Sequence, residues 1–131
     1  MNVRPEVAEI VQRFVRRGDG HLRAAVVLVE ADGAGVADAA CYHCEEAVDK
    51  YLKALLTLEG IFAPRTHDLN YIHNLLPENT RLFVDRSDLL YLSTYGIERW
   101  WDPDHDQAVR VLEIARSVRQ QIMDRVPTAL L

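Results

Sequence analysis

The stretch VADAACYHCEEAVDKYLKALLTL, residues 36–58, carries the strongest helix signal in the chain. Apolar side chains recur in it every three or four residues, the spacing that places them on one face of an α-helix. These residues are Ala40, Cys41, Cys44, Ala47, Val48, Tyr51, Leu52, Leu55, Leu56 and Leu58. Gly60 stands just beyond, where a glycine commonly ends a helix. The stretch therefore predicts a long helix with a broad buried face.

The opposite face of this helix is polar. It carries Glu45, Glu46, Asp49, Lys50 and Lys53. Glu46 and Lys50, and likewise Asp49 and Lys53, are four residues apart with the acid first, the order that stabilises a helix surface. This pattern favours a solvated face held by ion pairs, and the alternative is a functional polar strip in which Lys50 and Lys53 bind phosphate.

Helical patterns also precede and follow this stretch. Upstream, Gly18-Asp19-Gly20 is expected to break or kink the pattern, with Asp19 capping a second helix. Downstream, Thr66 or Asp68 can cap a short helix, and Asp102 or Asp104 can start the last one. The expected helices cover about residues 5–17, 21–31, 36–58, 66–76, 80–101 (with a break near residue 85) and 108–125. Five or six helices with short connections predict an all-α antiparallel helical bundle.

Length and composition are those of one folded domain over residues 1–131. Hydrophobic residues make up 49% of the chain and charged residues 27%, which excludes a disordered polymer. The net charge of −5 excludes a uniformly basic coat for nucleic acid but leaves local recognition of RNA or nucleotides open. With no apolar run long enough to span a membrane, no leader-like N-terminus and only two cysteines, we expect a cytoplasmic protein without membrane contact.

Two motifs resemble the HEPN family (higher eukaryotes and prokaryotes nucleotide-binding). The stretch ACYHCEEAVDKYLKALL, residues 40–56, is similar to the family's second helix, with Glu46 where glutamine is usual and Asp49 where glutamate is usual. The stretch RTHDL, residues 65–69, matches the start of the family's third helix. A weaker match is YGIERW, residues 95–100. The order of these motifs implies an HEPN-like fold.

The resemblance covers about residues 22–123 and implies a chemistry as well as a fold. Many HEPN proteins are metal-independent ribonucleases with an R-x₄₋₆-H motif, and Arg99 and His105 fit that spacing. The histidine would act as acid or base toward the RNA 2′-hydroxyl, and the arginine would neutralise the phosphate. The resemblance further implies a homodimer whose shared cleft comes from the fourth and fifth helices. It also implies a toxin–antitoxin pair with a nucleotidyltransferase partner.

Other functions remain open for this sequence. His105 is flanked by Asp104 and Asp106, which would repel an RNA phosphate, so it could be a solvent-exposed histidine of a linker. The chain would then be a non-catalytic HEPN module that binds a nucleotide or a nucleotidyltransferase partner, or a structural helical dimer.

The remaining candidates each have a binding and a structural interpretation. Arg65 and His67 could contact phosphate, although His67 is favoured as a hydrogen-bonding residue that fixes the loop between helices. Trp100 could stack on a base or anchor a core or dimer contact. A four-residue metal-ligand set could be assembled from Cys41, His43 and Cys44 with His67 or His73. The structural interpretation is favoured, because free cysteines on an apolar helix face usually belong to the core. No metal and no cofactor are expected.

Overall fold

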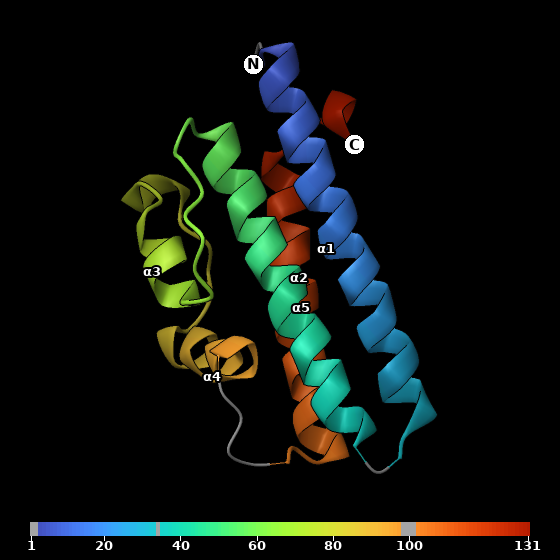
Figure 1. Cartoon of the computed structure of the whole chain (residues 1–131). Helices are drawn as coiled ribbons and strands as arrows, with labels where there is room; N and C mark the ends of the chain where they lie inside the picture. The colour runs from blue at the N-terminus through green and yellow to red at the C-terminus, as the bar shows by residue number, and fades with distance from the viewer. Residues whose placement is uncertain (1–2, 34, 98–101) are drawn as a thin grey trace.

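All the regular secondary structure in the described part of the chain is helical (Figure 1). The structure is a computed structural model that describes residues 3–33, 35–97 and 102–131, and it contains no strand within these ranges. Its helices are α1 (Pro5–Ala31), α2 (Val36–Leu58), α3 (Leu69–Asn74), the 3₁₀-helix η1 (Glu78–Thr80), α4 (Arg86–Ile97), α5 (His105–Arg125) and the 3₁₀-helix η2 (Thr128–Leu130). The predicted all-α class is confirmed.

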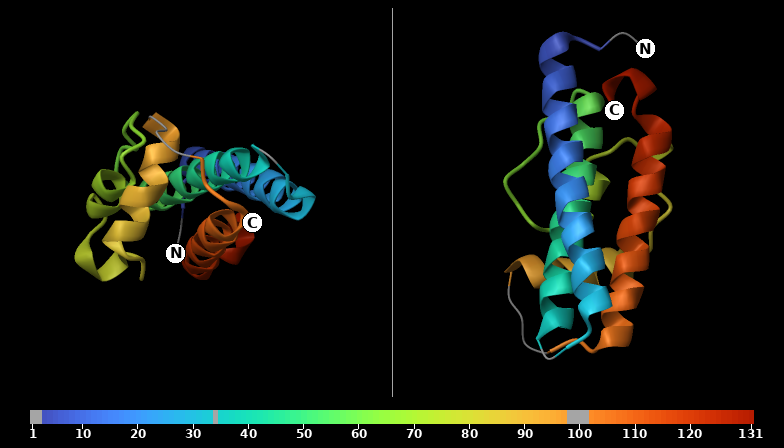
Figure 2. Two further views of the ribbon diagram at one scale, coloured as in Figure 1. Left: turned by 90° about the horizontal axis from the view of Figure 1, so that it is seen from below. Right: turned by 90° about the vertical axis from the view of Figure 1, so that its right-hand side faces the viewer.

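Helix α2 is the centre of the bundle and contacts the other four α-helices. Helices α1 and α5 are its long neighbours, while the shorter α3 and α4 lie together on the side of α2 away from α1 (Figures 1 and 2). Helix α1 runs antiparallel to α2, and α5 runs in the same direction as α2 because α3 and α4 carry the chain back along the bundle. None of the described helices has the length and apolarity needed to cross a membrane.

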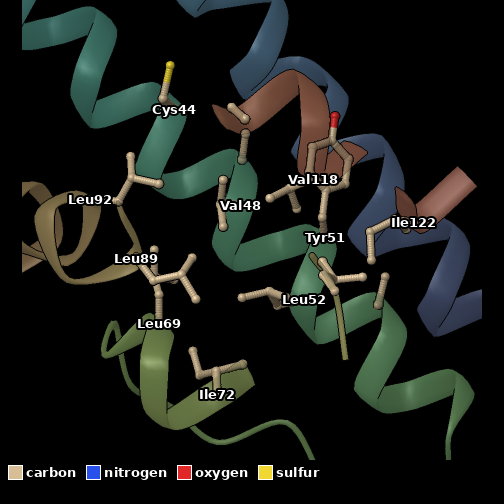
Figure 3. Packing of buried hydrophobic residues seen from close by; sticks show 14 of the residues in the cluster. Cys44, Val48, Tyr51, Leu52, Leu69, Ile72, Leu89, Leu92, Val118 and Ile122 are labelled. Carbon is tan, nitrogen blue, oxygen red and sulfur yellow. The ribbon is translucent and has the colours of Figure 1, made fainter. Parts of the chain in front are cut away.

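The predicted apolar face of α2 forms the middle of the core (Figure 3). The apolar residues of this face between Ala40 and Leu56 are all fully buried, and Leu58 is partly buried. Leu69 and Ile72 of α3 and Leu89 and Leu92 of α4 close one side of this face, while Val118 and Ile122 of α5 close another. The helical spacing therefore predicted this part of the core correctly.

The expected break in α1 is wrong, because the helix continues without interruption through Gly18-Asp19-Gly20. Gly18 is buried against the ring of Tyr51, and a Cβ there would lie 2.6 Å from Tyr51 Cε1. The next residue, Asp19, accepts hydrogen bonds through Oδ1 from Tyr51 Oη at 2.6 Å and from Arg119 Nε at 2.9 Å. Gly18 therefore allows a close approach of α1 to α2, and Asp19 joins α1 to α2 and α5.

Alanine at Gly18 and at Gly20 should change stability in opposite directions. Gly20→Ala should raise the free energy of unfolding by about 1 kcal/mol, the usual helix-propensity gain, because its Cβ would meet nothing within 4 Å. Gly18→Ala gains the same propensity but drives a methyl into a fully buried ring, which costs about 1–3 kcal/mol, so we expect a net loss. Urea unfolding followed by circular dichroism measures both, and a stabilised Gly18→Ala would contradict the close approach.

Two aspartates set helix starts that the sequence left open. The side chain of Asp68 accepts a hydrogen bond from Tyr71 N at 3.2 Å and caps α3. Asp104 accepts from Gln107 N at 2.8 Å while the Gln107 side chain accepts from Asp104 N, which is a capping box. Helix α5 therefore begins at His105, three residues before the expected start. Helix α4 begins at Arg86 instead of near residue 80, because η1 and an extended stretch come first.

Candidate functional site

The polar face of α2 is enclosed, so the favoured solvated face is wrong. Glu45 and Asp49 are fully buried and Glu46 is 8% exposed. The Lys50 and Lys53 side chains are only 16% and 12% exposed. His67, in the connection between α2 and α3, lies against this face. We call the group Glu45, Glu46, Asp49, Lys50, Lys53 and His67 the α2 polar cluster.

Two lysines neutralise part of this cluster. Asp49 Oδ2 accepts from Lys50 Nζ at 2.9 Å and lies 3.0 Å from Lys53 Nζ. Glu46 Oε2 accepts from Lys50 Nζ at 3.2 Å. The predicted pairs Glu46–Lys50 and Asp49–Lys53 are thus confirmed, but in a half-enclosed setting where each ion pair is screened less than at a surface. Both ammonium groups are held by carboxylates, which weakens the prediction that they bind phosphate.

His67 lies over the carboxylates of the cluster. Its Nδ1 is 3.3 Å from Glu45 Oε1, 3.6 Å from Glu46 Oε1 and 4.0 Å from Asp49 Oδ1. This arrangement supports the interpretation of His67 as a residue that links its loop to a helix. Arg65, two residues earlier, is exposed.

The carboxylates of the cluster do not ionise alike. Burial, with the nearby carboxylates of Glu46 and Asp49, raises the pKa of Glu45 to about 9. Burial also opposes ionisation of Glu46, but its contacts with Glu45 and Lys50 outweigh burial and lower its pKa. The two pKa values of this adjacent pair therefore move apart, which favours one proton shared between the two carboxyl groups.

A pair of histidines joins α1 to α2 near the cluster. His21 Nδ1 and His43 Nδ1 are 3.0 Å apart, so one ring donates and the other accepts. Burial lowers the pKa of His21, and His43 adds to this effect against the opposing charge of Glu46. A neutral accepting imidazole is consistent with this geometry.

His105 lies apart, on the first turn of α5. Its side chain is 43% exposed, and its Nδ1 is 3.4 Å from Asp32 Oδ1 at the end of α1. Asp32 has a positive φ of 44°, a conformation that asparagine and aspartate adopt more readily than most residues. Sequence reasoning missed Asp32, because no local pattern connects it to a histidine 73 positions later. Arg99 and Trp100 lie outside the described residues.

The cysteines and His73 are not part of a polar site. Cys41 and Cys44 are fully buried, and burial raises the pKa of Cys44 to about 12, which disfavours the thiolate that binds metals. His73 accepts a hydrogen bond through Nε2 from Leu82 N at 3.0 Å and fixes the turn after α3. Within the described ranges, the side chains close enough to share a metal ion are instead those of Glu45, Glu46 and His67.

Comparison with known proteins identifies the family. A family model of the HEPN domain matches residues 11–125, most of the chain. The chain therefore belongs to the HEPN domain family, and the resemblance drawn from its two motifs is confirmed. Comparisons with curated proteins and with solved structures gave no match.

Proposed function

We propose that this HEPN protein is a metal-independent ribonuclease in which His105 moves the proton of the RNA 2′-hydroxyl. The supporting observation is the exposed His105 imidazole, whose Nδ1 faces Asp32. A carboxylate beside one ring nitrogen orients the ring and its tautomer. Asp104, one of the acids that would repel RNA, is engaged in the cap of α5.

The proposed reaction uses the substrate's own nucleophile. His105 takes the 2′-hydroxyl proton as the 2′-oxygen attacks the phosphorus, and the P–O5′ bond breaks. The products are a 2′,3′-cyclic phosphate and a 5′-hydroxyl, which receives the proton. Arg99 neutralises the charge that builds on the phosphate oxygens. Arg65 adds a phosphate contact and Trp100 a stacking surface for a base.

The proposal includes two partners. A homodimer would bring two Arg99–His105 pairs into one positive cleft on a chain whose net charge is −5. A nucleotidyltransferase would act as the antitoxin of a toxin–antitoxin pair.

Purified protein should cleave RNA in EDTA, and the two proposed catalytic residues should be required. His105→Asn should lower the rate by about 10²–10⁴-fold, the usual contribution of a general acid–base group. Arg99→Gln should cause a comparable loss, whereas Arg13→Gln, an exposed charge on α1, should cleave as wild type does. Cleavage that persists in His105→Asn, or its absence from wild type, would sink the proposal.

A non-catalytic nucleotide-binding module is the second candidate. The observation that favours it is the exposed acid group around His105, namely Asp32, Asp102 and Asp106. These side chains suit a ligand of lower charge than an RNA strand. Calorimetric titration with nucleotides, together with the RNA cleavage test, separates the two candidates. The non-catalytic module should bind a nucleotide but should not cut RNA.

A further inference from the structure

The α2 polar cluster contains more carboxyl groups than ammonium groups. Three carboxyl groups (Glu45, Glu46 and Asp49) face two lysines, and Glu45 and Asp49 are fully buried. Buried charge is costly unless a partner compensates it. A proton or a bound cation must therefore supply the missing positive charge.

The spacing of the donor atoms fits a cation. One donor atom from each of Glu45, Glu46 and His67 lies within 4.8 Å of the others. The 3.3 Å and 3.6 Å separations from His67 Nδ1 to the two glutamates are long for an N–H···O bond, which is usually about 2.9 Å. The 3.3 Å separation equals the edge of a tetrahedron around zinc, which is about 3.3 Å for bonds of about 2.0–2.1 Å, and the 3.6 Å separation slightly exceeds it.

Two further oxygen atoms point to a missing ligand. Among the described residues, none donates a hydrogen bond to Glu45 Oε2 or Asp49 Oδ1, although both side chains are fully buried. Asp49 Oδ1 is directed at the site, since it lies 4.0 Å from His67 Nδ1. Buried polar atoms without partners are rare, and an ion with its bound water would satisfy both.

The surroundings prepare the donors and leave access to them. Lys50 holds Glu46 Oε2, so that Oε1 is turned toward His67. Such outer contacts orient metal ligands. The His67 side chain is 42% exposed, which opens one side of the site to solvent.

We propose that Glu45, Glu46 and His67 bind one divalent transition-metal ion, with zinc as the best match to this donor set. Imidazole and carboxylate donors at tetrahedral spacing suit this class of ion. The ion would fasten the connection between α2 and α3 onto α2, which is a structural role. This site is separate from the proposed ribonuclease chemistry, and its test does not depend on RNA cleavage.

Calorimetric titration of metal-stripped protein with zinc tests the proposal. Wild type should bind one equivalent, and its melting temperature should rise with zinc. Glu45→Gln and His67→Gln, which keep side-chain size, should weaken binding by at least about tenfold and lose that rise. Glu113→Gln, an exposed acid on α5, is the matched control and should bind as wild type does. Circular dichroism in EDTA verifies that each variant is folded.

Cobalt as a spectroscopic substitute identifies the donors. Tetrahedral oxygen and nitrogen ligation gives visible bands without the near-ultraviolet thiolate band that Cys41 or Cys44 would add. A thiolate band in wild type would overturn the assignment. So would equal zinc affinity in all four proteins, or no zinc binding by wild type, in which case the cluster holds a proton instead.

Discussion

Tyr51→Ala should lower the free energy of unfolding by about 3–5 kcal/mol, the usual cost of removing a buried aromatic ring. Tyr51 is fully buried at the centre of α2, and its ring fills the gap opposite Gly18. A methyl group at position 51 would leave a cavity between α1 and α2, and Asp19 would lose one of its two donors. Urea unfolding at neutral pH, followed by far-ultraviolet circular dichroism, measures the change.

Tyr51→Phe separates the ring from its hydroxyl. Burial and the neighbouring Asp19 carboxylate raise the pKa of Tyr51, so its hydroxyl is a donor throughout the physiological range. Because Arg119 still binds Asp19 in the variant, the loss should be only about 1 kcal/mol, the net value of a typical hydrogen bond. A Tyr51→Ala protein within about 1 kcal/mol of Tyr51→Phe would mean that the ring packing contributes little, contrary to the value for buried aromatics.

Asp49→Ala should be the second severely destabilising change, with a loss of about 3 kcal/mol. Breaking a buried ion pair from one side costs about 3–5 kcal/mol, and the lower end applies because both lysines keep some exposure. Without Asp49, Lys53 loses the carboxylate at 3.0 Å, and among the residues that the structure describes Lys50 keeps Glu46 as its carboxylate partner. Unfolding should be measured in EDTA, so that a metal ion does not contribute.

Lys53→Met provides the comparison for this site. It removes one ammonium group and keeps most of the side-chain volume, while Asp49 retains Lys50 at 2.9 Å. We expect a loss of about 1 kcal/mol, in the range of a partly exposed ion pair. A larger loss in Lys53→Met than in Asp49→Ala would show that the carboxylate is not the common partner of the two lysines.

The sequence correctly predicts the features that depend on residues close together along the chain. The apolar face of α2 follows from helical spacing alone. The caps of α3 and α5, Asp68 and Asp104, are each one of the two residues that the sequence offered, and the structure decides between them. The wrong predictions of a break in α1 and of a solvated face on α2 both depend on distant contacts. Gly18 does not break α1, because Tyr51 occupies the space beside it.

The polar site illustrates the same limit. Glu46 and Asp49 have the spacing of surface ion pairs, and only the fold of the later connection places His67 over them. The contact between His105 and Asp32 likewise joins the start of α5 to the end of α1. Residue types and sequence spacing can identify such side chains as candidates, but their burial and their partners are determined by the tertiary structure.

The Asp19 carboxylate also has a consequence for how the bundle assembles. Its bond to Tyr51 spans 32 positions of the chain, and its bond to Arg119 spans 100. Closing a longer loop costs more chain entropy, so the hairpin of α1 and α2 can form before α5 docks. The carboxylate then receives Arg119 as α5 docks, so one acceptor sets the register of α5 against that hairpin.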